Sequence, residues 1–119
     1  MHIEKRHYGN YAVLKFSGNM AESLEASGLF DLIRDLVQDS VYRIIADMKE
    51  VKWINSTGIG ALMGCLSYLD AHNAELIVIN MPEKVKEVLS LMDLLPYFKR
   101  HTTLNQAITG NHNYHTIDY

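Results

Sequence analysis

Two adjacent hydroxyl side chains, Ser56 and Thr57, are the residues of this sequence best placed to take part in chemistry. They follow a short extended segment, and the apolar spacing after them predicts that a helix begins near Ser56. The first N–H groups of a helix have no partner within it, so a serine oxygen here can accept one of their hydrogen bonds. The same groups favour negative charge. A phosphate on Ser56 would therefore leave the helix intact while it adds about −1.5 to −2 charges to an exposed loop, which changes what can dock there.

Three glycines, Gly58, Gly60 and Gly64, lie within the same predicted helix. Each glycine in a helix interior costs about 0.8–1 kcal/mol relative to alanine, so we expect either the sheet or a partner to approach this helix closely. On the residues alone, the simpler interpretation is favoured: Ser56 only caps the helix, and the glycines only allow tight packing.

The other candidates for chemistry are weaker. Cys65 lies more than two turns into the predicted helix, where we expect a core residue and not a reactive thiol. The six histidines, His112 and His115 among them, lack the converging acidic or thiol ligands of a metal site, so we predict none. Trp53, in the loop before the motif, is interpreted either as a cover for the core or as an anchor at a partner surface.

No motif typical of an enzyme is present. The glycines do not follow the Gly-x-Gly-x-x-Gly spacing, and the sequence contains neither a Gly-Lys-Ser/Thr loop nor a Gly-x-Ser-x-Gly elbow. No histidine or acid is placed by its spacing to activate Ser56. We therefore expect a protein that is not an enzyme, with no catalytic residues and no cofactor.

The composition is that of an ordinary globular domain. The 119 residues are 48% hydrophobic and 21% charged, with a formal net charge of −3 and one cysteine. The basic residues are scattered, so we expect no nucleic-acid partner. No stretch approaches the roughly 20 apolar residues of a membrane helix, and no secretory signal is evident, so we expect no membrane association and a cytoplasmic location.

Strands alternate with helices along the chain in the order β-β-α-β-α-β-α-β-α, which predicts an α/β fold with a mixed, mostly parallel sheet packed with α-helices. The strands are expected at 2–7, 10–17, 42–47, 75–79 and 97–101, with a Gly9-Asn10 turn between the first two. The helices are expected at 21–38, 56–72, from about Pro82 to Met92, and after Thr103 through Ile108. Residues 48–55 are predicted to be a loop with at most a short extended piece. We expect one domain, 1–109, and a polar tail, 110–119.

The sequence resembles STAS domains, and among them the single-domain anti-sigma factor antagonists. Those proteins carry an Asp-Ser-Ser/Thr-Gly-Leu-Gly signature at a strand-to-helix junction, which stands here as Asn55-Ser56-Thr57-Gly58-Ile59-Gly60. The resemblance extends upstream through Ile44-Ile45-Ala46-Asp47-Met48, similar to the family's preceding strand, and the order of elements agrees up to about Ile108.

The resemblance implies a STAS-like fold and a function in transcription regulation. In the family, the first hydroxyl residue of the signature, here Ser56, is phosphorylated by a partner anti-sigma factor that is an ATP-dependent serine kinase. The unphosphorylated antagonist binds that kinase and frees a sigma factor, and a serine phosphatase resets the phosphorylated form. The phosphorylation loop would consist of Asn55, Thr57 and Gly58. The predicted partner-binding residues are Gly60, Ala61, Gly64, Asp47, Trp53 and Met20, with Met20 expected to be exposed.

The sequence departs from the family pattern in two places. Asn55 stands where the family has an acidic residue, and Gly18-Asn19-Met20-Ala21 replaces a Gly-Glu/Asp-Leu-Asp stretch. Two other functions therefore remain open: an unphosphorylated scaffold subunit of a signalling complex, and a small-molecule or nucleotide sensor that uses the same loop.

Overall fold

The computed structural model describes residues 1–109, so the tail predicted at 110–119 lies outside the described residues. The strands are β1 (His2–Tyr8), β2 (Tyr11–Met20), β3 (Arg43–Ile54), β4 (Glu75–Ile79) and β5 (Lys99–His101). The helices are α1 (Leu29–Gln38), α2 (Ser56–Ala71), α3 (Glu83–Leu91) and α4 (Leu104–Thr109), with a 3₁₀ turn η1 (Leu95–Tyr97) before β5. The predicted order of strands and helices is confirmed.

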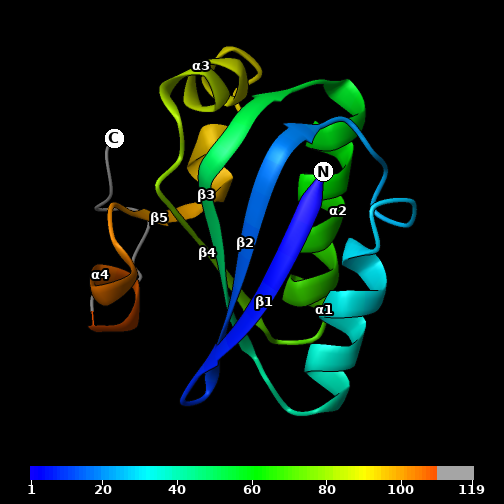
Figure 1. The fold of residues 1–119 in the computed structure, drawn as a ribbon, viewed down its shortest axis with the longest axis vertical. Helices are drawn as coiled ribbons and strands as arrows, with labels where there is room; N and C mark the ends of the chain where they lie inside the picture. Colours follow the sequence, from blue (N-terminus) through cyan, green and yellow to red (C-terminus); the bar gives the residue numbers. More distant parts are fainter. Residues whose placement is uncertain (110–119) are drawn as a thin grey trace.

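One five-stranded sheet, in the order β1-β2-β3-β4-β5, forms the centre of the fold. β1 and β2 are antiparallel around a tight turn in which Gly9 has a φ of 60°, and the remaining neighbours are parallel. Helices α1 and α2 lie against one face of the sheet, and α4 lies on the other side (Figure 1). The prediction of a mixed, mostly parallel sheet is confirmed.

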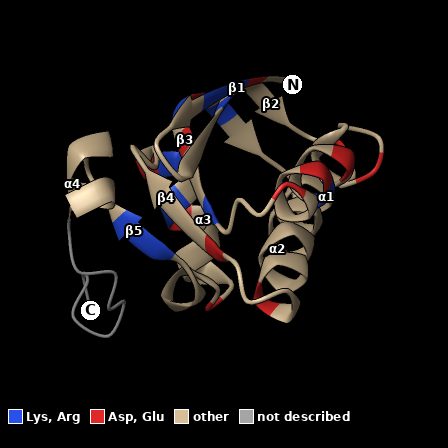
Figure 2. Cartoon of the chain, turned by 90° about the horizontal axis from the view of Figure 1, so that it is seen from below, with Lys and Arg blue, Asp and Glu red and all other residues tan. Residues whose placement is uncertain are grey.

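The alternation of side chains along the strands creates two apolar layers. Residues such as Leu14, Ala46 and Val78 point to the face of α1, α2 and α3 and belong to the larger core. Their neighbours Val13, Ile45 and Ile77 point to the opposite face and belong to a smaller cluster that is covered by α4. Lys and Arg are distributed over separate strands, and Asp and Glu gather on α1 and the loop before it (Figure 2).

The first helix is shorter than predicted, because it begins at Leu29 and not at residue 21. Gly28 precedes it in a left-handed conformation with a φ of 81°, which ends the turns of residues 24–28 just before the helix begins. The last strand is also shorter, since η1 occupies the start of the predicted segment. The third helix ends at Leu91, and Met92, the last residue of the predicted helix, is half exposed just beyond its end.

The loop predicted at 48–55 is instead the second half of one long strand. β3 pairs with β4 only as far as Asp47, and beyond that point it pairs with β2 up to the Met20–Ile54 pair. Two register shifts, which place extra residues on β3 between Asp47 and Trp53, interrupt the pairing. These bulges break the alternation of apolar residues, which explains why the strand was not evident in the sequence. Their consequence is that β3 carries the chain directly to the start of α2.

Candidate functional site

The predicted motif lies where three elements meet: the ends of β2 and β3 and the first turn of α2. Met20 and Ile54 are register partners in the last pair of β2 and β3. The backbone N–H of Asn55 then donates to the carbonyl oxygen of Met20 at 3.2 Å. The backbone at the entry of α2 is therefore held by the end of a strand from a distant part of the sequence.

Asn55, and not Ser56, caps the helix. Asn55 has an extended backbone, with φ −113° and ψ −175°, and its Oδ1 accepts the N–H of Gly58 at 3.0 Å. Its carbonyl oxygen accepts the first helical hydrogen bond, from the N–H of Ile59 at 2.8 Å. The prediction that Ser56 is the cap is wrong by one residue, because both side chains are good caps and only the backbone conformation distinguishes them.

Gly58 allows the closest approach in the site. A Cβ atom at this position would lie 1.9 Å from the carbonyl oxygen of Met20 and 2.5 Å from its carbonyl carbon. Any side chain larger than hydrogen therefore collides with the backbone at the end of β2. Met20 itself is only 1% exposed, so its predicted place at a partner surface is wrong: its side chain belongs to the core.

The side chains of Ser56 and Thr57 are exposed on the first turn of α2. The N–H groups of these two residues have no acceptor within the helix, whereas Gly58 is already capped by Asn55. The first turn of α2 contains no acidic residue, so its own side chains leave the partial positive charge of the helix N-terminus unopposed. The loop thus presents two hydroxyl groups in a position that favours added negative charge.

The three small residues predicted to form a docking surface on α2 separate into different environments. Ala61 is buried in the core, and Gly64 faces Leu24, whose Cδ2 would lie 3.1 Å from an added Cβ. Gly60 is exposed, and no atom lies within 4 Å of where its Cβ would be. Ala61 and Gly64 thus serve internal packing, and only Gly60 presents its missing side chain to solvent.

The other two predicted partner residues, Trp53 and Asp47, lie in different parts of β3. Trp53 is next to the loop, paired in register with Asn19 and 44% exposed. Asp47 lies in the middle of β3, where its Oδ1 accepts the side-chain amide of Asn80 at 3.2 Å and the N–H of Lys49 at 3.1 Å. Asp47, predicted to bind the partner, is therefore not part of the motif loop, because β3 continues well beyond it.

Cys65 is buried on the inner side of α2, and burial raises the pKa of its thiol to about 12. The thiol is therefore neutral at physiological pH, as expected for a core residue. Among residues 1–109, no three His, Cys, Asp or Glu side chains converge as metal ligands. His112 and His115 lie outside the described residues.

Comparison with known proteins places this geometry in a family. The family model of the STAS domain matches residues 2–107. The fold is similar to that of the anti-sigma factor antagonist SpoIIAA in its unphosphorylated form, with a TM-score of 0.73 and 19% identity over 90% of this chain and 93% of that one. The Bacillus cell fate determinant SpoIIAA in its phosphorylated form gives a TM-score of 0.67 and 19% identity over 90% and 96% of the two chains.

An anti-sigma factor antagonist from Mycobacterium paratuberculosis is also similar, with a TM-score of 0.73 and 21% identity over 91% of each chain. These likenesses confirm the predicted STAS-like fold. None of the helices within the described part of the chain is long and apolar enough to cross a membrane.

Proposed function

This chain belongs to the STAS domain family, and on that premise we propose that it is an anti-sigma factor antagonist-like binding module that is switched by phosphorylation of Ser56. Its partner would be an anti-sigma factor with serine kinase activity, in the cytoplasm, and a serine phosphatase would reset it. The unphosphorylated form would hold the partner, so that a sigma factor is released, and the phosphorylated form would let the partner go. The module would bind proteins and catalyse no reaction itself.

The proposal rests on one observation: the exposed hydroxyl of Ser56 is not the cap of α2, because Asn55 has that role. Because the side chain of Asn55 satisfies the N–H of Gly58, the fold does not depend on the hydroxyl of Ser56. A phosphate there would meet the free N–H groups of the first turn and the positive end of the helix dipole. Phosphorylation would then change the charge of the surface and leave the fold unchanged.

The comparisons support this interpretation at the level of the fold. SpoIIAA is known in an unphosphorylated and a phosphorylated form, and the present chain is similar to both over 90% of its length. A fold of this kind therefore accommodates a phosphorylated state without a change of architecture.

The exposed residues around Ser56 suit a docking surface. Gly60 costs helix stability without relieving any internal contact, which is accounted for if the backbone of a partner comes close to it. Trp53 adds a large, partly exposed aromatic side chain beside the loop, of the type enriched in interface hot spots. We propose that Ser56, Thr57, Gly60 and Trp53 contact the partner directly.

Phosphopeptide analysis of the protein purified from its own host tests the proposal. We expect a phosphatase-sensitive phosphate on Ser56 that is absent from a Ser56→Ala variant, while Thr57→Ala serves as the matched control and keeps it. Ser56→Asp should weaken capture of the kinase. A Ser56 that stays unmodified through growth and stress conditions contradicts the switch.

That contrary result would favour an unphosphorylated scaffold subunit of a signalling complex. The feature that supports this second function is the loss of negative charge around the loop, where Asn19, Ala21 and Asn55 stand in place of the acidic residues typical of the family. A stable complex with a partner that is not a kinase, formed equally by wild type and Ser56→Ala, would distinguish the scaffold from the switch.

A further inference from the structure

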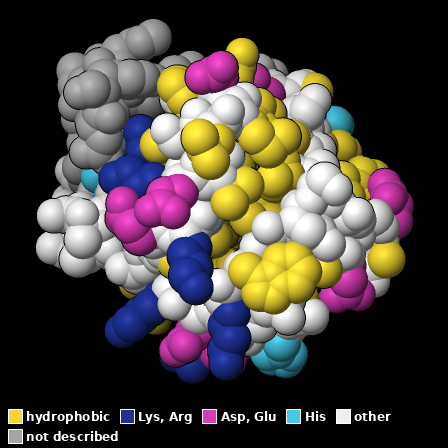
Figure 3. Space-filling view, turned by 90° about the horizontal axis from the view of Figure 1, so that it is seen from above, with side chains coloured by type: hydrophobic (Ala, Val, Ile, Leu, Met, Phe, Trp, Pro, Cys, Tyr) yellow, Lys and Arg dark blue, Asp and Glu magenta, His cyan; other side chains and the backbone are white. Residues whose placement is uncertain are grey.

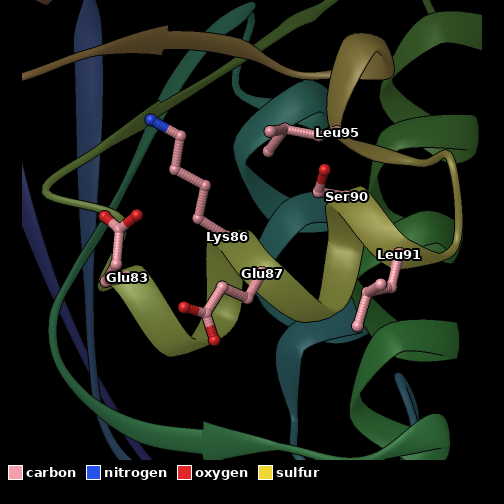
Figure 4. A pocket seen from close by; sticks show the side chains of 6 residues that line it. All are labelled: Glu83, Lys86, Glu87, Ser90, Leu91 and Leu95. Carbon is pink, nitrogen blue, oxygen red and sulfur yellow. The ribbon is translucent and has the colours of Figure 1, made fainter.

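A groove along α3 lies outside the Ser56 loop. It has a volume of about 420 Å³ and is formed by residues of α3 and η1 (Figure 4). Its lining consists of Glu83, Lys86, Glu87, Ser90, Leu91 and Leu95. No residue of the segment 53–60 contributes to it, so any function of the groove is separate from the phosphorylation loop.

The apolar part of the groove is unusually exposed. Leu91, the last residue of α3, is 85% exposed, the highest value of any large hydrophobic side chain among the described residues. Met92 follows it and is half exposed, and Leu95 lines the groove from η1. Hydrophobic side chains also gather into one broad patch on the end of the molecule at which α3 lies (Figure 3). Such a patch on a small domain indicates a contact surface.

The charged part of the groove is not neutralised within the described residues. Glu83 and Glu87 are one helical turn apart, and no ion pair joins them or Lys86 to another described residue. Like charges at this spacing destabilise a helix. The negative charge of Glu83 is offset by the partial positive charge of the N-terminus of α3, but Glu87 lies too far along the helix for this effect. The side chains of Lys86 and Glu87 point to opposite sides of α3 (Figure 4), so the lysine does not cover this carboxylate.

Glu87 lies one turn before Leu91 and one turn after Lys84, and Lys84 forms no ion pair with it, so an unpaired carboxylate stands beside an exposed leucine. An exposed leucine beside an uncompensated carboxylate is complementary to an apolar side chain next to a cation. An amphipathic helix presents both groups at the spacing of one turn, and docking of such a helix in a groove is a recurrent mode of recognition.

We propose that the α3 groove binds an amphipathic helix of a partner protein, which packs apolar side chains against Leu91 and Leu95 and places a Lys or Arg beside Glu83 and Glu87. This surface goes beyond the proposed Ser56 switch and does not depend on it. It would let the domain hold a second protein while the Ser56 loop is free or occupied.

The test is a titration of the ¹⁵N-labelled full chain with a synthetic amphipathic peptide of Leu and Lys, about 14 residues or four helical turns long. A matched peptide with Glu in place of Lys is the chemical control. We expect shifts of backbone resonances confined to α3 and η1 with the Lys peptide, and at least about tenfold weaker binding of the Glu peptide. Leu91→Ser and Glu87→Lys should each weaken the binding about tenfold, as for central residues of an interface.

Glu25→Lys, an exposed acid on the loop before α1, makes the same charge change outside the groove and should leave the affinity unchanged. Equal binding of both peptides, shifts that spread over other surfaces, or an equal effect of Glu25→Lys and Glu87→Lys would overturn the proposal. Ser56→Asp should bind the Lys peptide as the wild type does. The peptide titration thus tests the α3 groove alone, and the phosphorylation switch is tested separately by the phosphate on Ser56.

Discussion

Replacement of Gly58 by alanine should destabilise the protein although it places a better helix former in a helix. The added Cβ would lie 1.9 Å from the carbonyl oxygen of Met20, whereas real Cβ contacts are essentially never shorter than 3.0 Å. The start of α2 and the end of β2 must therefore move apart by at least 1.1 Å, the difference between 3.0 and 1.9 Å. That movement also strains the hydrogen bond from the N–H of Asn55 to the same oxygen.

The expected magnitude follows from two opposing effects. Overpacking of a rigid site costs about 1–3 kcal/mol or more, and here the group that must yield is backbone and not a flexible side chain. Alanine returns up to about 1 kcal/mol through its helix propensity. We expect a net loss of about 2 kcal/mol in the free energy of unfolding, which for a domain of this size lowers Tm by roughly 8 °C.

Gly60→Ala is the matched control, two residues along the same helix. No atom lies within 4 Å of its added Cβ, so only the gain in helix propensity, about 0.5–1 kcal/mol, should remain. Urea and thermal unfolding followed by circular dichroism measure both variants. If Gly58→Ala is as stable as the wild type, or if both alanines stabilise alike, then β2 does not approach α2 as described and the reasoning fails. If Gly60→Ala is more stable but binds the partner less tightly, the exposed glycine serves docking.

Three further predictions concern the same helix. Asn55→Ala should lower the free energy of unfolding by about 1 kcal/mol, because the N–H of Gly58 loses its acceptor, whereas Asn55→Asp should keep or slightly raise stability in urea unfolding. Ser56→Ala should change stability by less than about 0.5 kcal/mol in the same assay, because its hydroxyl is not the cap. The pKa of Cys65, raised to about 12 by burial, should make its thiol unreactive toward a thiol reagent at pH 8 until the protein unfolds. Since this folded-state pKa exceeds the unfolded value near 9, stability relative to Cys65→Ala should be constant below pH 9 and fall between pH 9 and 12.

Much of the fold can be predicted because its regular elements carry regular patterns. The helix 56–71 and the strand 75–79 agree closely with their predicted bounds. The helix carries an apolar stripe at helical spacing, and the strand is a short, unbroken apolar run that is buried on both faces. The errors fall where a local feature interrupts the pattern. Gly28 separates a turn segment from α1. The bulges between Asp47 and Trp53 place exposed lysines and a glutamate within a strand, so the sequence there lacks the alternation that indicates one.

The candidate site could be located from the sequence, but its internal roles could not. Ser56 and its glycines stood out by type and spacing, and they do lie at the entry of α2. That Gly58 meets Met20 is a contact between segments distant in the chain, and no local pattern indicates which glycine of a helix faces the core. For the same reason the sequence predicts a partner surface at Met20 and Ala61, although both are buried.

At the entry of α2, the residues that stabilise the fold differ from those that are exposed, and this difference determines how a phosphate on Ser56 could act as a switch. Asn55 caps α2, and Gly58 lets the first turn of α2 lie against the end of β2, whereas Ser56, Thr57 and Gly60 are exposed and make no contact that the fold requires. A charge added to Ser56 therefore acts on a surface whose backbone is already fixed. On the proposal that docking uses the exposed set, substitutions of Asn55 or Gly58 should change stability and binding together. Substitutions of Ser56 and Thr57 should change binding with little effect on stability, whereas Gly60→Ala should also gain stability through helix propensity. A measurement of stability and binding for Asn55→Ala and Ser56→Asp distinguishes a rigid switch from one that acts by unfolding the loop.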